Sequence, residues 1–407
     1  MASSAKELRP GQDCDLAPAC TEKAEEVVPV APTQAVPPDG GTQAWLAVLG
    51  GFLCQFCSFG FINALGIFQF QYEEVILTTY SSSSISWILT FQLFLMFFLS
   101  QAVGLLVDMY GPRPVMIPAS VLVVLGVLTL SFCTEYWQIF LAQSVCFGVG
   151  AAGVFMPGLV VAGQYFHQKR ALAVGVVASG SSLGGVVFPI FLTTLFDRIG
   201  FAPTLRWTAL MLGILLVAAN LLISPLHKPK GWQGKRSIAS LAAFRSPPFL
   251  LYVSGAFLFF WGVFGPFNFM ALFASQSEDS AKIALYLVSI TNAASIPGRV
   301  LPSHIADRLG HFAVMTTMAY ASGILVLGIW LPLNYHRSMA GLIIFTLGFG
   351  FASGAFVSLM TPCVVDLCDG KTENLGVMLG STMNVVAFAF VLPFPAISFP
   401  SMTMGPS

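Results

Sequence analysis

Long apolar stretches follow one another along almost the whole chain, and they decide the solvent in which it folds. Of its 407 residues, 56% are hydrophobic and only 9% are charged, whereas a soluble globular domain carries about 25% charged residues. A helix of about 20 apolar residues crosses a lipid bilayer. We predict an all-α membrane protein with eleven spanning helices, over residues 44–70, 86–106, 114–132, 136–163, 170–196, 204–223, 248–273, 282–305, 312–331, 339–363 and 377–399.

A short polar segment occurs twice, each time between two apolar stretches. Residues 108–111 read Asp-Met-Tyr-Gly and residues 307–310 read Asp-Arg-Leu-Gly, and a Val-Met pair follows each copy at 115–116 and 314–315. The two copies are therefore in register at an offset of 199. A duplicated membrane half is how many secondary transporters are built, so the repeat predicts two pseudo-symmetric helix bundles.

The polar interruptions divide the chain into four regions. Residues 1–43 form a tail that we expect to be disordered and to lack a cleavable signal peptide. Residues 44–223 form the first six-helix bundle, 224–247 a basic linker, and 248–407 the second bundle. With the N-terminus in the cytoplasm, cytoplasmic segments hold 14 of the 18 Lys and Arg residues. This bias predicts that orientation for a multi-pass protein, which we expect in the plasma membrane.

The end of the chain departs from a two-fold repeat of six helices. The counterpart of the stretch 204–223, about 200 residues later, would begin near residue 404, and the chain stops at Ser407. Four prolines interrupt the last residues, at 393, 395, 400 and 406, and an interior proline breaks a helix. We therefore expect a truncated second bundle without helix 12 and a C-terminus on the non-cytoplasmic side.

The duplicated polar segments are candidate gates. Their glycines permit a tight reversal of the chain, and each Asp can meet a helix N-terminus or a basic residue of the facing helix. Such contacts would close the cytoplasmic side in one conformation and break in the other, although an ordinary charged loop is the alternative. The candidate gating residues are Asp108, Gly111, Arg113, Asp307, Arg308 and Gly310.

Two asparagines occupy equivalent places in the first and seventh stretches. An offset of 205 aligns Asn63 with Asn268, and also Gly60 with Gly265. A two-fold axis along the membrane normal would place both amides on opposite walls of one central cavity, where they would bind substrate. The alternative is a polar contact that holds helices together.

Three further passages resemble one known family. They are Asp39-Gly40-Gly41 with Trp45; Tyr165-Phe166 with Lys169-Arg170-Ala171-Leu172-Ala173, Gly175, Gly180 and Gly184; and Ser289-Ile290, Asn292-Ala293-Ala294-Ser295 and Gly298-Arg299. With the duplicated hairpin, they resemble the major facilitator superfamily and, within it, the fungal branch of the monocarboxylate porters. The resemblance implies the major facilitator fold.

The same resemblance suggests how a substrate is bound. Many monocarboxylate porters hold the substrate carboxylate with an Arg at the position of Arg299, with an Asp one turn earlier and a Lys in the first helix for proton coupling. Here Ser295 and Asn63 stand at the latter two positions, so we expect weak or absent proton dependence. Asn292, Ser295 and Arg299 join the candidate substrate-binding residues. The alternative for Arg299 is a helix-end residue that snorkels to water.

The remaining composition favours an amphipathic cargo. The chain has 37 Phe, several of them near the paired asparagines, and an apolar pocket with few polar anchors suits an organic molecule better than a hydrated ion. We predict a secondary active transporter that works by alternating access, with export of a secondary metabolite as the first choice. Monocarboxylate uptake, a nutrient sensor and an inactive truncated relative are the alternatives.

No motif points to an enzyme, a metal site or a cofactor. The Cys54 and Cys57 pair lies inside an apolar stretch, where two small apolar residues are the simpler interpretation. We expect the partners to be a small organic substrate and the lipid bilayer, with no nucleic acid, and we expect a monomer.

Overall fold

Helices make up nearly all of the chain that the computed structural model describes. The described residues are 39–224, 226, 244–275, 278–333, 335, 338–368 and 374–391, without the side chains of 268–269 and 271–285. All of them belong to one compact unit, Pro37–Ser407. Residues 392–407, on which the predicted lack of helix 12 rests, and most of the predicted tail and linker lie outside these residues.

The first half, residues 44–223 of the sequence prediction, contains long helices interrupted by short π-helical stretches at Phe56–Gly60, Tyr72–Ile76 and Phe140–Phe147. Its α-helices are α1 (Thr42–Gln55), α2 (Leu65–Gln71), α3 (Ser82–Phe98), α4 (Ser100–Tyr110), α5 (Pro112–Leu130), α6 (Tyr136–Ile139), α7 (Gly148–Tyr165), α8 (Arg170–Ile199) and α9 (Phe201–Leu222).

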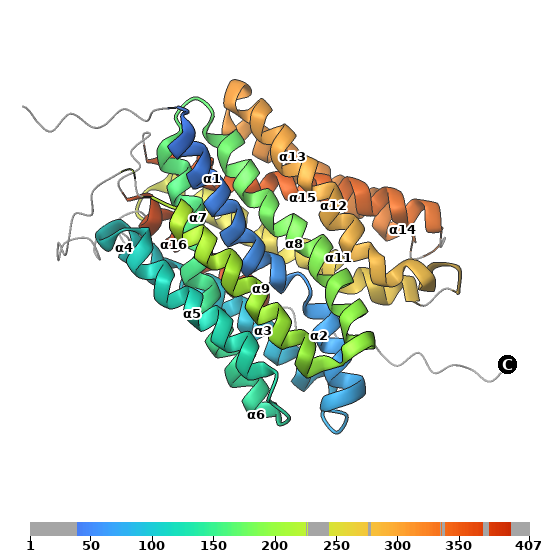
Figure 1. The fold of residues 1–407 in the computed structure, drawn as a ribbon. Coiled ribbons are helices and arrows are strands. Elements are labelled where there is room, and N and C mark those ends of the chain that lie inside the picture. Colours follow the sequence, from blue (N-terminus) through green and yellow to red (C-terminus); the bar gives the residue numbers. More distant parts are fainter. Residues whose placement is uncertain are drawn as a thin grey trace, which may run out of the picture. The chain divides into compact units, whose positions relative to one another are not determined.

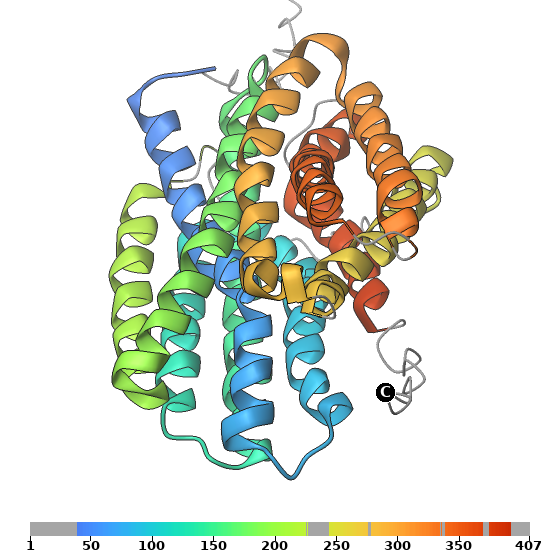
Figure 2. The same cartoon turned by 90° about the vertical axis from the view of Figure 1, so that its right-hand side faces the viewer.

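The second half follows the same plan. Its described α-helices are α11 (Pro247–Ser275), α12 (Glu278–Leu309), α13 (His311–Leu325), α14 (Leu331–Leu333), α15 (Met339–Leu367) and α16 (Leu375–Val391), with a π-helical stretch at Val326–Trp330. Figure 2 shows α12 and α13 beside α15, and these three helices pack on one another.

The prediction that the chain consists of membrane-spanning helices is confirmed. Within the described part of the chain, nine helical segments are long and apolar enough to cross a membrane. The other two predicted spans correspond to α12, which carries several polar side chains, and to α16, which has 17 residues. The chain is therefore an all-α, multi-pass membrane protein, and the count of eleven spans stays a prediction.

The two duplicated hairpins turn on glycine, as predicted. Gly111 has φ 87° between α4 and α5, and Gly310 has φ 98° between α12 and α13. Only glycine adopts such angles without steric cost. The next helix begins immediately after each glycine, so the chain reverses within a single residue.

Small residues let α8 approach its neighbours closely. A Cβ atom on Gly180 would lie 2.2 Å from the carbonyl oxygen of Phe52, and one on Gly184 would lie 2.6 Å from the Cα of Gly60. Figure 1 shows α1 and α8 side by side. Helices in a bilayer gain no hydrophobic energy by associating, so such backbone contacts supply van der Waals attraction that lipid does not.

Glycines also line the contacts between the two halves. A Cβ on Gly104 of α4 would lie 2.0 Å from the carbonyl oxygen of Gly376 of α16. At the contact related to it by the internal repeat, a Cβ on Gly175 of α8 would lie 2.4 Å from the carbonyl oxygen of Arg299 of α12. The backbones of α4 and α16, and those of α8 and α12, therefore approach each other closely where the two halves meet.

We expect Gly180→Ala to destabilise the protein although alanine is the better helix former. The added methyl would overlap the Phe52 carbonyl, and overpacking costs about 1–3 kcal/mol. Gly323→Ala is the matched control, because nothing lies within 4 Å of its Cβ position and Ala is favoured there by about 1 kcal/mol. Thermal unfolding of the purified variants should show a lower melting temperature for the first only. Equal melting temperatures would contradict this account of α1–α8 packing.

Candidate functional site

A carboxylate of the first half holds the start of a helix in the second. Asp108, near the end of α4, accepts hydrogen bonds from the backbone N–H groups of Gly376 (3.2 Å) and Val377 (2.9 Å). These are the second and third residues of α16. First-turn N–H groups have no partner inside their own helix and lie at the positive end of its dipole. We call this contact the first latch.

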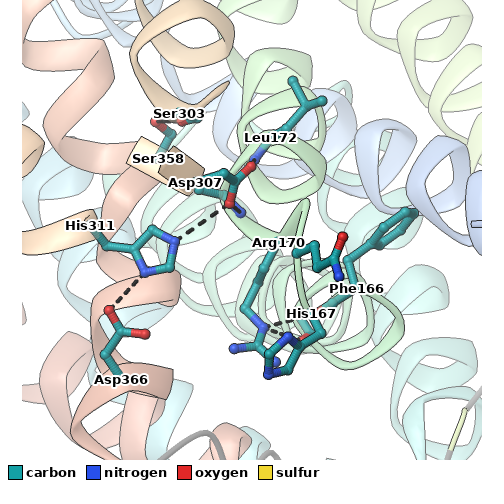
Figure 3. Close-up of polar contacts among 12 residues, drawn as sticks. Phe166, His167, Arg170, Leu172, Ser303, Asp307, His311, Ser358 and Asp366 are labelled. Carbon is teal, nitrogen blue, oxygen red and sulfur yellow. Dashed lines mark hydrogen bonds and ion pairs between the residues drawn. The ribbon is translucent and has the colours of Figure 1, made fainter. Parts of the chain in front are cut away.

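A carboxylate of the second half likewise binds the start of a helix in the first half. Asp307, near the end of α12, accepts hydrogen bonds from the N–H groups of Ala171 (2.8 Å) and Leu172 (3.0 Å), the second and third residues of α8. Figure 3 shows Asp307 against the first turn of α8. This is the second latch. The predicted contact between Asp and a helix N-terminus is therefore present at both hairpins, and the gating role stays a prediction.

The basic residues of the hairpins lie elsewhere. The Arg113 guanidinium donates to the carbonyl oxygens of Ile223 (3.0 Å) and Leu221 (3.4 Å), at the C-terminal end of α9 in its own half. A cation there satisfies the last carbonyls and the helix dipole. Arg308 lies in the last turn of α12 and is exposed. Their gating roles remain predictions.

The second latch has an additional titratable neighbour. The Nε2 atom of His311 lies 3.5 Å from Oδ1 of Asp307, and its Nδ1 lies 2.7 Å from Oδ2 of Asp366, at the end of α15. Arg170, at the start of α8, is buried and donates from Nε to the carbonyl oxygens of Gly163 (3.1 Å) and Phe166 (2.9 Å).

Two of the passages that carry the family resemblance, the one around Asp39 and the one that begins at Tyr165, meet at this end of the fold. The carboxylate of Asp39 accepts from the N–H of Gln168 at 2.8 Å and from the N–H of His167. The rings of Trp45 and Phe166 lie edge to face, with centroids 5.4 Å apart. Asp39 therefore holds the loop that leads into α8, whose first turn Asp307 holds from the other half.

Arg299 is buried between the halves. Its side chain is 6% exposed, and its Nη1 donates to the carbonyl oxygen of Ala178 (2.6 Å) and to the Ser181 hydroxyl, both on α8. Its Nε has no hydrogen-bond partner, and no described carboxylate forms an ion pair with it. This burial contradicts the alternative that Arg299 snorkels to water.

Asn63 and Ser295, which belong to different halves, contact adjacent residues of α8. Asn63 donates from Nδ2 to the Ser181 carbonyl oxygen (3.1 Å), and the Ser182 and Ser295 hydroxyl oxygens lie 2.6 Å apart. We call Asn63, Ser181, Ser182, Ser295 and Arg299 the polar cluster. The chain breaks its helical path at Asn63, between the π-helical stretch and α2, and broken helices form the substrate sites of many transporters.

The other two predicted binding residues are placed differently. Asn292 is buried, donates from Nδ2 to the Val288 carbonyl oxygen (2.9 Å), and packs on Gly185, where a Cβ would lie 2.5 Å from its amide carbon. This contact fits helix packing between α8 and α12. The side chain of Asn268 lies outside the described residues, so its pairing with Asn63 stays a prediction.

An aromatic cluster joins the halves near the polar cluster. The ring of Phe97 on α3 lies 5.9 Å from that of Phe59 and 5.6 Å from that of Phe155 in the first half. In the second half it lies 6.3 Å from Phe260 and is stacked at 5.0 Å on Phe390. The backbone N–H of Asn63 donates to the Phe59 carbonyl oxygen (3.1 Å), so the segment between α1 and α2 connects the two clusters.

Comparison with known proteins agrees with this geometry. Residues 47–392 match the family described as the Major Facilitator Superfamily. The chain belongs to this superfamily. It is 44% identical to the MFS-type transporter hasB of Aspergillus fumigatus, covering 92% of this chain and 86% of that protein. It is 37% identical to the fujikurins efflux protein of Gibberella fujikuroi, covering 91% of this chain and 76% of that protein.

A solved structure supports the fold in the same way. The human organic anion transporter TETRAN superposes with a TM-score of 0.67 at 16% identity, covering 87% of this chain and 92% of that one. At this identity the similarity concerns the fold alone. The predicted superfamily is thus confirmed and this member is a transporter by family, whereas the monocarboxylate-porter resemblance stays a prediction.

Several residues of the site escaped the sequence prediction. Ser181 and Ser182 lie in a passage that carries the family resemblance, but only the contacts of α8 show that they face Asn63 and α12. Asp366 gave no signal, because it is one acidic residue at a helix end. His311 directly follows the second duplicated hairpin, so a comparison of the two copies residue by residue would have found it.

We expect Ser182→Cys with Ser295→Cys to form a disulfide across the halves, because their oxygens are 2.6 Å apart and an S–S bond is about 2.05 Å. Peptide mapping by mass spectrometry after mild oxidation should detect it. Ser144→Cys with Ser295→Cys is the control, since Ser144 contacts Ile88 instead. Adding Asp307→Ala should lower the yield of the first pair. Equal yields from both pairs would be inconsistent with this interface.

Proposed function

We propose that this transporter exports a small amphipathic organic acid of the secondary-metabolite class by alternating access. The observation that carries the proposal is Arg299, a buried guanidinium with a free Nε–H and no described counter-ion. An uncompensated buried charge costs several kcal/mol. A carboxylate bound there would offset this cost and accept paired hydrogen bonds from the fork of the guanidinium.

The aromatic cluster suits the rest of such a molecule. Phe97 and Phe390 come from different halves and stack on each other, so relative motion of the halves would separate the rings and open apolar surface beside Asn63. Aromatic rings bind apolar bodies with a favourable geometry. The names of the related efflux proteins support export, and the direction of transport is part of the proposal.

The two latches suit alternating access. Both lie at hairpins of the same end of the fold, and each joins a carboxylate of one half to a helix of the other. A hydrogen bond to a charged group contributes about 1.5–3 kcal/mol, so the latches together favour the closed arrangement by several kcal/mol. Cargo binding must stabilise the open arrangement by a comparable amount for the protein to cycle.

We expect Arg299→Gln to reduce transport of organic acids by about tenfold or more, from the loss of a charge-assisted bond. Membrane vesicles from cells that express the chain can be tested with aromatic carboxylic acids and their methyl esters. The wild type should prefer the acids, and the variant should lose this preference. Arg198→Gln, at an exposed cation of α8, is the matched control. Equal transport of acids and esters by the wild type would rule out Arg299 as the anion site.

A further inference from the structure

The two latches are alike in geometry but differ at one neighbouring position. In the second, His311 follows Gly310 and contacts the latch carboxylate of Asp307. The position 199 residues earlier, which follows Gly111, is Pro112. Proline has no side-chain proton to exchange, so at this repeated position the second latch has an imidazole and the first does not.

The position of the imidazole between two carboxylates determines which protonation state of the ring can donate to both. Both ring nitrogens face carboxylate oxygens, Nδ1 towards Asp366 at 2.7 Å and Nε2 towards Asp307 at 3.5 Å. A neutral imidazole has a single N–H donor and a lone pair on its other nitrogen, whereas the protonated ring has two donors. Only the protonated ring donates to both carboxylates. With the shorter bond kept, loss of the proton would point the Nε2 lone pair at Asp307.

The charged groups around His311 come from three helices. Asp307 lies on α12 and Asp366 on α15, and both also attract the buried Arg170 at the start of α8. From α11, Tyr252 packs its ring on Phe312, but its hydroxyl donates to the Met360 carbonyl oxygen. The two carboxylates are therefore the described groups that His311 itself contacts.

We infer that His311, with Asp307 and Asp366, forms a proton-binding site that sets the strength of the second latch. A proton from water at this end of the fold binds Nε2, which then donates to Asp307, the carboxylate that accepts from the first turn of α8. Release of the proton weakens the latch. Acidification on this side, the cytoplasm by the distribution of basic residues, therefore favours the closed arrangement. Its effect on transport rests on the proposed function, but the latch itself does not.

Hydrogen exchange tests the site in the full chain without any cargo. The N–H groups of Ala171 and Leu172 have no partner within α8, so their protection reports the bond to Asp307. Those of Gly376 and Val377 report the first latch and serve as the internal control. Hydrogen exchange is measured on the protein in lipid nanodiscs and is resolved to single residues by electron-transfer fragmentation. The quantity compared is the protection factor of the second-latch N–H groups divided by that of the first-latch N–H groups.

In the wild type, this ratio should fall by about tenfold, equivalent to about 1.4 kcal/mol, between about pH 5 and about pH 10, a range that includes histidine titration. His311→Gln should give a low ratio that does not depend on pH. His311→Lys, which keeps a positive charge over most of this range, should give a high and nearly constant ratio. Asp366→Asn should move the midpoint to lower pH by removing one carboxylate.

A ratio that is constant in the wild type, or that changes equally in His311→Gln, would overturn the proton site. The wild-type measurement alone decides this if a variant fails to fold. A transporter that moves no organic acid but shows the pH-dependent ratio would contradict the proposed cargo and leave the proton site intact. Transport of organic acids together with a ratio that does not change with pH would contradict the proton site and leave the proposed cargo intact.

Discussion

The arrangement of the two halves depends on a carboxylate bound to the first turn of a helix that belongs to the other half. This interaction suits a packed helix end, because first-turn N–H groups have no partner within their own helix. In each contact the carboxylate accepts from two backbone N–H groups at the start of a helix. Since Asp108 and Asp307 are related by the internal repeat, the same type of contact occurs twice, and each copy joins one half to the other.

Close packing makes the latches possible. Asp108 can reach the amides of α16 because Gly104 and Gly376 leave no side chain between the helix backbones. The second copy replaces Gly104 by Ser303, and Gly175 supplies the missing space on α8. The Ser303 hydroxyl lies 2.9 Å from that of Ser358 on α15, so the extra polar atom is paired within the second half. The repeat thus conserves the contact while its packing partners differ.

The periodicity and the internal repeat allowed the fold to be predicted from the sequence. The side-chain contacts between helices could not be predicted in this way. Apolar stretches and the 199-residue repeat predict the helices, the glycine turns and an Asp at a helix N-terminus, because each of these depends on neighbouring residues. Which atoms meet across helices depends on rotation about each helix axis. The π-helical stretch at Phe56–Gly60 alters that rotation, so the contact of Asn63 with Ser181 could not be read from a regular 3.6-residue period. The same holds for Phe97, whose partners come from four other helical segments.

The latch and the polar cluster lie on the same two helices, which couples them. On α12, Arg299 and Asp307 are eight residues apart, about 12 Å along the axis, and both bind α8, at Ala178 and at its first turn. A carboxylate that bound Arg299 would compete with the Ala178 carbonyl for the guanidinium. The α8–α12 contact would then lose one of its attachments while the second latch remains. Cargo and latch would therefore oppose each other through one helix pair, and the linkage requires that a weaker latch raises affinity for cargo to the same extent that cargo weakens the latch.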